Sequence, residues 1–253
     1  MTFTQDQLER YRRNLLVPGV GEAGQERLAR ARVCVVGLGG LGSAAAWYLT
    51  AAGVGALGLL DADVVELSNL QRQIVHSTPR LGQAKAESAA VSLAALNPDV
   101  RLEPQIVRVS TANAAELLGA YDLVVDATDS FEAKFMLNDT CLDLRKPLAT
   151  AGIRELSGQA MLVVPGATAC LRCAIPAPEE DAPADDESGV LGPVPGILGS
   201  IQALEAVRWL VGLWRPAPDG AGRLHSVDGG AMRLRTVSIP RRAGCRCAAV
   251  WSE

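Results

Sequence analysis

The chain has few aromatic side chains, no long apolar stretch and no excess of basic residues. Phe, Tyr and Trp together make up 4% of its 253 residues. A membrane-spanning helix needs a run of about 20 apolar residues, so none is expected here. The first residues also lack the basic and apolar segments of a secretory signal. The formal net charge of −4 and the absence of a basic arm argue against nucleic acid as a partner. We therefore expect a cytoplasmic protein.

The abundant residues favour one large α/β domain over 1–253. Hydrophobic residues make up 49% of the chain, and a core of Ala, Val, Leu and Gly suits buried parallel strands covered by helices. The length is within the range of a single domain of this class. Six cysteines in a reducing compartment are more consistent with thiols or metal ligands than with disulfides.

The order of the apolar segments predicts a Rossmann-like nucleotide-binding fold. Helices are expected at 4–16, 22–31, 43–52, 85–95, 131–145 and 199–211, and strands at 32–37, 56–61, 100–107, 122–126, 147–151 and 158–164. The last of these strands would pair with 224–228 or 232–238. The predicted fold class is therefore α/β, with a mostly parallel sheet that antiparallel strands extend in the C-terminal half.

Three parts are expected within the domain. The N-terminal helices occupy 1–31, a nucleotide-binding half follows at 32–151, and the second half covers 152–253. Within the second half, residues 176–195 contain six acids and five prolines and show no periodicity. Such a composition predicts a mobile, solvated loop.

A glycine-rich turn joins the first expected strand to the next helix. Its pattern is Gly37-x-Gly39-Gly40-x-Gly42. Glycines permit a tight turn and a close approach of the backbone to phosphate, and the helix N-terminus supplies free N–H groups. Asp61 ends the next strand, where a carboxylate can accept hydrogen bonds from ribose hydroxyls. The motif alone leaves two alternatives open, an NAD-binding domain and a turn whose glycines serve only close packing.

The segment that begins at Asp61 carries groups that a nicotinamide-dependent enzyme does not need. Asp63 and Asn69 lie within it, followed by the guanidinium of Arg72, with Lys85 further along the chain. Attack on the α-phosphate of ATP expels pyrophosphate, so it needs cations around the β- and γ-phosphates and a metal ion near the leaving oxygens. This cluster therefore indicates nucleotidyl transfer.

Two carboxylates lie where the fourth expected strand ends, at the edge of the sheet where open α/β folds bind ligands. Asp129 is the predicted Mg²⁺ ligand. Asp126 is expected to be a helix cap or a buried hydrogen-bond acceptor. Neither His76 nor His225 is assigned a role in the reaction, and His76 is expected to pack or to form a hydrogen bond near the site.

Four segments occur in the order found in one known family: Val36–Gly42, Ser68–Gln73, Gly82–Lys85 and Gly199–Ala206. From Glu9 to the last cysteines, the chain resembles the ThiF/MoeB/HesA family, bacterial relatives of the ubiquitin-activating enzymes. The resemblance implies an adenylyltransferase that uses ATP and Mg²⁺. Its substrate would be the C-terminal Gly-Gly carboxylate of a ubiquitin-like sulfur-carrier protein, which then becomes a thiocarboxylate for thiamine, molybdopterin or thiolated tRNA.

The resemblance also implies roles for single residues, and residues 152–253 would be the carrier-binding half. Asp61 would hold the ribose, and Asp129 would bind Mg²⁺. The phosphates would be held by Asn69, Arg72 and Lys85, with Asp63 and Gln73 beside them. Arg13 matches the arginine that enters the active site of the neighbouring subunit, which implies a homodimer. A surface salt bridge is the alternative for Arg13.

Two cysteine pairs, Cys170-x-x-Cys173 and Cys245-x-Cys247, could form a closed tetrahedral site for structural zinc. The family usually has two spacer residues in both pairs. Side chains at i and i+2 of a regular strand point to opposite faces, so the second pair must lie on a turn. The alternative is that one cysteine is free and that the site is weak or lost.

Some family members carry a reactive cysteine in the loop before the match to Gly189. Residues 184–188 contain none here. Cys34 and Cys141 are expected to be buried and unreactive, and the chain lacks the residues of an added sulfurtransferase domain. We therefore expect the reaction to stop at the acyl-adenylate, with sulfur supplied by an external donor.

One smaller departure concerns Ser130, which stands where the family commonly has asparagine and could weaken a nucleotide contact. Three other functions stay open. The chain could adenylylate a peptide or another small protein, could be a nicotinamide-dependent oxidoreductase, or could be a non-catalytic scaffold.

Overall fold

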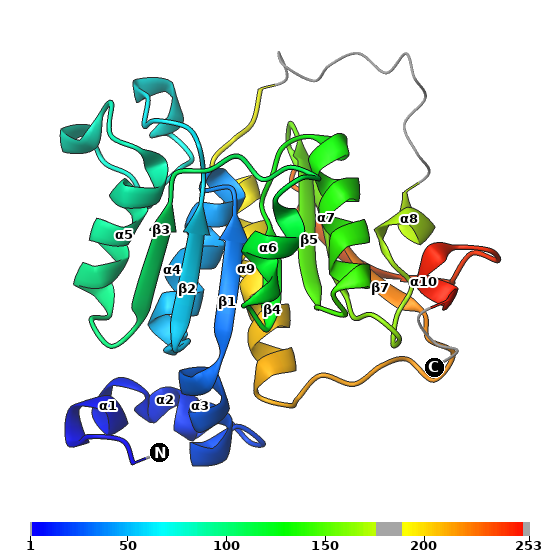
Figure 1. The fold of residues 1–253 in the computed structure, drawn as a ribbon, viewed down its shortest axis with the longest axis horizontal. Coiled ribbons are helices and arrows are strands. Elements are labelled where there is room, and N and C mark those ends of the chain that lie inside the picture. Colours follow the sequence, from blue (N-terminus) through cyan, green and yellow to red (C-terminus); the bar gives the residue numbers. More distant parts are fainter. Residues whose placement is uncertain (1, 176–188, 250–253) are drawn as a thin grey trace.

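The computed structural model describes residues 2–175 and 189–249, and Figure 1 shows how their helices and strands are arranged. Within these ranges no helix is both long and apolar enough to cross a membrane. The predicted acidic loop lies largely outside them, as does the cysteine-free segment 184–188.

The described strands form one eight-stranded sheet in the order β3-β2-β1-β4-β5-β6-β7-β8. The strands from β3 to β5 are parallel, whereas β5 to β8 form antiparallel neighbours. The bounds are β1 (Arg32–Val36), β2 (Ala56–Leu60), β3 (Arg101–Gln105), β4 (Leu123–Asp126), β5 (Leu148–Arg154), β6 (Ser157–Val163), β7 (Gly222–Asp228) and β8 (Arg233–Ile239). The predicted fold class is confirmed, including the change from parallel to antiparallel strands.

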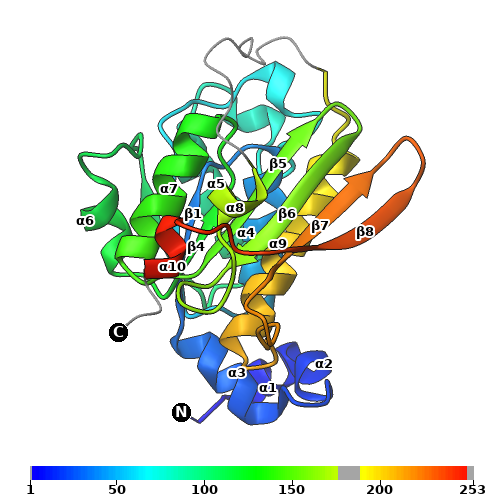
Figure 2. The same cartoon turned by 90° about the vertical axis from the view of Figure 1, so that its right-hand side faces the viewer.

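Helices cover both faces of this sheet. One face is covered by α4, α5 and α9, and the other by α6 and α7 (Figures 1 and 2). The bounds are α1 (Gln5–Arg10), α2 (Arg12–Leu15), α3 (Gly21–Arg30), α4 (Gly40–Ala52), α5 (Lys85–Leu96), α6 (Ala114–Gly119), α7 (Phe131–Asp143), α8 (Leu171–Ala174), α9 (Pro193–Leu210) and α10 (Arg246–Ala249).

The alternation of side chains along β1 explains the two-sided core. Val33 and Val35 pack into the layer formed with α4 and α9, while Cys34 and Val36 pack into the layer formed with α7. All four are buried, as expected for a parallel strand covered on both faces. Gly199 lets α9 cross α4 closely, since a Cβ there would lie 2.3 Å from the carbonyl oxygen of Leu41.

Several element boundaries differ from the sequence prediction. The helix expected at 4–16 is broken at Tyr11, whose ring is buried and whose hydroxyl accepts a hydrogen bond from the Asn97 amide at 2.9 Å. The α9 helix begins at Pro193 rather than at 199, so the last three residues of the expected loop are helical. Proline is well suited to the first turn of a helix. The short helix α6 was not predicted.

Candidate nucleotide-binding site and cysteine cluster

The glycine turn lies between β1 and α4, where the strand order changes direction and β1 and β4 are neighbours. Gly37 has a φ of +89°, and a Cβ there would lie 2.7 Å from the Ala127 carbonyl oxygen. A Cβ on Gly42 would lie 1.9 Å from the carbonyl oxygen of Gly37. These two glycines are therefore required by packing. Gly39 faces more open space, because its Cβ would meet only the Gln73 amide nitrogen, at 3.7 Å.

This difference predicts opposite effects for two matched substitutions. Gly42→Ala should destabilise the fold by about 1–3 kcal/mol because the new methyl overlaps backbone. Gly39→Ala should leave the melting temperature close to that of the wild type but raise the KM for ATP, because its methyl occupies the phosphate approach. Thermal unfolding and ATP-dependent kinetics of both variants test this. A raised KM in a stable Gly42→Ala variant, with Gly39→Ala unaffected, would contradict it.

Asp61 follows β2 and holds the turn in place. Its carboxylate accepts hydrogen bonds from the backbone N–H of Leu38 at 2.7 Å and of Asp63 at 2.8 Å. The residue is 9% exposed. A carboxylate has about four acceptor positions, so two hydrogen bonds leave capacity for a further donor. The ribose contact stays a prediction.

Lys85 begins α5 and is buried with its ammonium directed to Asp63. The distance from Nζ to the Asp63 carboxylate is 3.3 Å. Arg108 lies 3.2 Å from the other oxygen of the same carboxylate. Sequence reasoning missed Arg108, which follows β3 and has no motif around it. In this arrangement Asp63 is shared between two cations at the edge of the site.

Three of the residues predicted to contact the nucleotide lie in or just after the short helix Leu67–Asn69. Asn69 is buried, and its side-chain oxygen accepts from the backbone N–H of Glu66 at 3.1 Å. The guanidinium of Arg72 is half-exposed and donates to the Ser68 carbonyl at 3.1 Å. Gln73 is buried beside the glycine turn, and its Oε1 has no hydrogen-bond partner among the described residues. An orphaned acceptor here fits a ligand that brings its own donor.

The two carboxylates at the end of β4, Asp126 and Asp129, have different surroundings. Asp129 is exposed and forms no hydrogen bond or ion pair with another described residue. A single exposed carboxylate is a donor set suited to Mg²⁺, which keeps several waters and shares phosphate oxygens. Asp126 is fully buried and accepts from Thr128 and Thr150. The expectation that Asp126 is a buried acceptor is therefore confirmed.

His76 is buried against the glycine turn and is hydrogen-bonded to its backbone. One ring nitrogen, Nε2, lies 3.0 Å from the Leu38 carbonyl oxygen and the other, Nδ1, lies 2.9 Å from the Ser88 hydroxyl. Burial lowers the pKa of His76, so the ring is neutral at pH 7. Donation to Leu38 and acceptance from Ser88 satisfy both nitrogens. The expected hydrogen-bonding role is confirmed.

Arg13 lies on α2, away from the other predicted site residues of its own chain. Figures 1 and 2 place α1, α2 and α3 together at the end of the sheet where the parallel strands begin. Asn14 also contacts the carbonyl oxygen of Ala52 at the last residue of α4, whereas the glycine turn lies at its first residue. Arg13 is exposed, so it can contact a second molecule.

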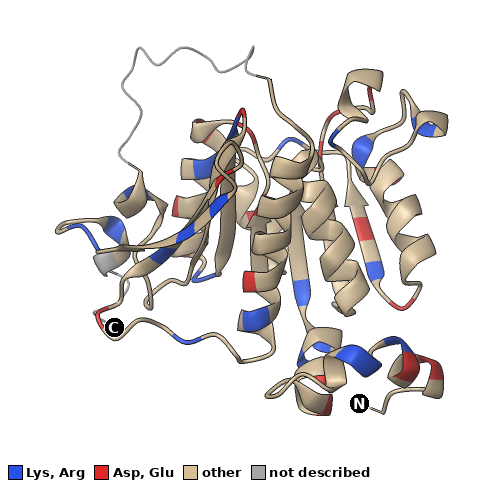
Figure 3. Cartoon of the chain, turned by 180° about the vertical axis from the view of Figure 1, so that it is seen from behind, with Lys and Arg blue, Asp and Glu red and all other residues tan. Residues whose placement is uncertain are grey.

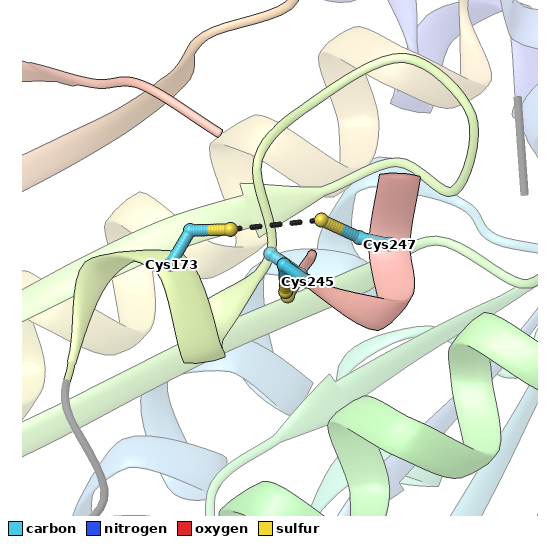
Figure 4. A group of neighbouring side chains, drawn as sticks. Cys173, Cys245 and Cys247 are labelled. Carbon is cyan, nitrogen blue, oxygen red and sulfur yellow. Dashed lines mark hydrogen bonds between the residues drawn. The ribbon is translucent and has the colours of Figure 1, made fainter. Parts of the chain in front are cut away.

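The four cysteines of the two pairs converge, as Figure 4 shows for three of them. Their sulfur atoms all lie within 4.8 Å of one another, and the pairs Cys170–Cys245 and Cys173–Cys247 are each 3.6 Å apart. A tetrahedral zinc ion with Zn–S bonds of about 2.3 Å would need sulfurs about 3.8 Å apart. The cluster therefore fits zinc without large movement.

Local structure explains how two cysteines separated by one residue, Cys245 and Cys247, can both join the cluster. Cys245 precedes α10, next to Gly244 with a φ of +72°, so the second pair lies at a turn and helix start rather than on a strand. The backbone N–H of Arg242 donates to the Cys173 sulfur at 3.4 Å. Arg172 binds Asp139 through three hydrogen bonds of 2.8, 2.9 and 3.2 Å, which anchor α8 to α7.

The two remaining cysteines are buried within the core. Burial raises the pKa of Cys141 to about 12 and raises the pKa of Cys34 beyond the usual range. Because the thiolate is the nucleophile, neither thiol is suited to covalent chemistry, as expected.

Comparison with known proteins adds one decisive finding. The profile of the ThiF family matches residues 11–248. The chain belongs to the ThiF family. A Thermus thermophilus member named "Sulfur carrier protein adenylyltransferase" is 41% identical over 252 residues, which cover 97% of this chain and 92% of that protein.

Other relatives of this ThiF-family chain are longer or more distant. The Drosophila willistoni protein named "Adenylyltransferase and sulfurtransferase MOCS3" is 40% identical, and the match covers 96% of this chain and 54% of that one. The chain thus spans about half the length of that relative. A solved structure of E. coli MccB with MccA-N7isoASN has a TM-score of 0.83 at 20% identity and covers 97% of this chain and 75% of that one. This likeness shows the shared fold.

Proposed function

We propose that the chain adenylylates the C-terminal glycine of a ubiquitin-like sulfur-carrier protein with ATP and Mg²⁺. The observation that carries the proposal is the convergence of the glycine turn, Arg72, Lys85 and Asp129 at one edge of the sheet, in a chain that matches a sulfur-carrier adenylyltransferase over nearly its whole length. The acyl-adenylate is then available for thiocarboxylate formation. The pathway served would be thiamine, molybdopterin or tRNA thiolation.

The residues bind and orient, and none needs to act as a covalent catalyst. The carrier carboxylate is the nucleophile and is already ionised at pH 7. The glycine turn and the N-terminus of α4 place the phosphates, while Arg72 and Lys85 offset charge on the leaving pyrophosphate. Asp129 would hold Mg²⁺, which supplies further charge neutralisation at the phosphate oxygens. Asp61 and the orphaned Gln73 acceptor orient the nucleoside, and Asn69 shapes the segment between them.

Structural zinc at Cys170, Cys173, Cys245 and Cys247 is part of the same proposal. Four thiolates leave no open coordination position, so the ion would have no part in the chemistry. Its role is to fasten the C-terminal segment to α8 and, through Arg172, to α7.

The functional unit is a homodimer in which Arg13 completes the site of the partner subunit. Helix α4 has no charged residue and α9 has only Glu205 and Arg208, and Figure 3 views the face on which they lie. An open groove of about 500 Å³ lies on this face. Five of the residues that line it are apolar and each at least 40% exposed: Tyr48, Ile74, Ile197, Leu204 and Leu234. An exposed apolar surface of this kind marks an interaction site.

A two-fold symmetric dimer formed through this apolar surface would bring Arg13 to the site of the partner subunit. A two-fold axis that lies in the face and runs perpendicular to α4 reverses the direction of the helix in the partner. The end of one subunit that carries α2 is then beside the glycine turn of the other. Such a dimer brings an otherwise distant arginine to each site.

Mixing two inactive variants tests the shared site. Arg13→Ala and Arg72→Ala should each lose activity as homodimers. After subunit exchange, half of the dimers are mixed and each contains one intact site, so about a quarter of wild-type activity should return. No recovery in a mixture proven by mass spectrometry to contain heterodimers would show that Arg13 acts within its own subunit or not at all.

Sulfur is delivered by an external donor, because the described thiols outside the cysteine cluster are buried and the segment 184–188 has none. Incubation of wild-type protein with ATP, Mg²⁺ and carrier should therefore give no covalent enzyme–carrier adduct in non-reducing electrophoresis. A disulfide-linked or thioester-linked adduct would contradict this step.

Pyrophosphate exchange tests the function as a whole. The protein is incubated with ATP, Mg²⁺ and labelled pyrophosphate, with and without candidate carriers that end in Gly-Gly. Exchange that depends on a carrier, and is lost when its last glycine is removed, would support the proposal and identify the pathway. ATP binding without exchange for any intact carrier would favour a different substrate or a scaffold, and NAD binding without ATP binding would favour an oxidoreductase.

A further inference from the structure

A buried ion pair lies directly beneath the candidate site. Asp126, the last residue of β4, is fully buried, and Lys134 on α7 is 5% exposed. The Lys134 ammonium lies 3.4 Å from each oxygen of the Asp126 carboxylate and donates to the Ala151 carbonyl oxygen at 2.5 Å. The reaction described above makes no use of either charge.

Stability alone does not account for this pair. Removing two charges from water costs free energy that their attraction often fails to recover, and apolar replacements of buried ion pairs are frequently neutral or stabilising. The core layer on the α7 side contains the fully buried Leu137 and Leu148 together with the buried amide of Asn138. The position of the pair therefore suggests a task beyond packing.

The pair holds the turn that carries Asp129. The carboxylate of Asp126 accepts from the backbone N–H of Thr128 at 3.0 Å and from its hydroxyl at 2.6 Å. The other carboxylate oxygen accepts from the Thr150 hydroxyl at 2.6 Å. Asp129 is the next residue after Thr128, so its backbone position depends on these bonds.

The same turn also supports the glycine turn. The backbone N–H of Ala127 donates to the Val36 carbonyl oxygen at 2.9 Å. A Cβ on Gly37 would lie 2.7 Å from the Ala127 carbonyl oxygen and 3.3 Å from the Thr128 nitrogen. The segment fixed by Asp126 is thus in contact with the first glycine of the candidate phosphate site.

We propose that Lys134 is a positioning residue, which acts through Asp126 and Thr128 to place both the Asp129 carboxylate and the glycine turn for MgATP. Lys134 fixes the Asp126 carboxylate between α7 and β5, and it cancels a negative charge that would otherwise lie beneath the triphosphate. Neither Lys134 nor Asp126 touches the nucleotide. The inference rests on the proposed use of ATP and Mg²⁺.

The experiment separates positioning from folding with three variants. Lys134→Arg keeps the charge, and Asp126→Asn with Lys134→Met removes both charges. Thr128→Val removes the hydroxyl bond to Asp126 and keeps the backbone N–H bond. Melting temperatures establish that each variant is folded. Calorimetry with a non-hydrolysable ATP analogue, at several Mg²⁺ concentrations, then gives the Kd independently of turnover, and pyrophosphate exchange gives KM values for ATP and for the carrier.

Lys134→Arg is expected to bind the analogue as the wild type does. The double variant and Thr128→Val should raise the Kd of the analogue, and the Mg²⁺ concentration for half-maximal binding, by at least about tenfold, a loss of one charge-assisted interaction. The KM for the carrier should not change. Wild-type Kd and Mg²⁺ dependence in a folded double variant, or in Thr128→Val, would overturn the inference. If the wild type binds the analogue but exchanges no pyrophosphate, the proposed function fails while the binding data still decide this point.

Discussion

Carrier-dependent pyrophosphate exchange is expected to fall by about 1000-fold when Asp129 is replaced by alanine. The exposed Asp129 carboxylate follows β4 at the edge of the sheet and has no competing partner among the described residues. Its loss would remove the only protein ligand that we assign to Mg²⁺. The pyrophosphate leaving group would then keep most of its charge in the transition state.

The Mg²⁺ dependence of the remaining activity tests the assignment of Asp129 as well as the size of the loss does. High Mg²⁺ should partly restore the activity of Asp129→Ala, because a weaker site can still be filled by mass action. Glu132→Ala is the matched control, since Glu132 is an exposed acid in the first turn of α7. It should retain wild-type activity. Equal losses in both variants, or a full rate in Asp129→Ala, would remove Asp129 from the site.

Loss of zinc is expected to be the largest effect on stability. Replacing Cys173 with serine breaks the four-sulfur cluster that joins α8 to the start of α10. If the ion contributes about 4 kcal/mol, the melting temperature of a chain of this size should fall by about 8–16 °C. Zinc content by mass spectrometry should fall in parallel.

The thiols themselves predict how the site behaves without metal. Burial raises the pKa of Cys170 to about 11, so at pH 7 this thiol is protonated without metal and zinc must displace its proton to bind. The affinity of the site for zinc should therefore fall as the pH is lowered. Cys141→Ala is the matched control, because it removes a buried thiol outside the cluster. It should keep zinc while losing only a small part of the stability. Zinc bound to Cys173→Ser with wild-type affinity would contradict a four-cysteine site.

Much of the architecture could be predicted because its signals are local. The apolar residues of β1 and the glycines that follow it identify a buried strand and a turn at a helix start without reference to the rest of the chain. The strand β6 was predicted in the same way, but its partner was left open between 224–228 and 232–238, and the tertiary structure pairs it with β7. Boundaries were less predictable at Tyr11, where a buried ring interrupts the expected helix, and at Pro193, where the helix begins within the expected loop.

The individual contacts of the site depended on the tertiary structure. Arg108 reaches Asp63 across 45 residues of sequence, and no motif surrounds it. Lys134 would have been placed on a solvated face of α7 from its type alone, yet its partner Asp126 is buried beneath the site. No local sequence signal indicates that Arg13 lies far from the glycine turn of its own chain.

The sequence by itself therefore determined the fold class and the family, and it predicted the glycine turn and the residues that we propose for nucleotidyl transfer and zinc binding. These depend on residue type and on spacing along one strand or turn. Only the tertiary structure decided which glycines are required by packing, that four sulfurs meet despite the short second pair, and that Asp126 is paired with Lys134. Those outcomes depend on how close distant segments come, which is set by strand order and helix packing rather than by local sequence.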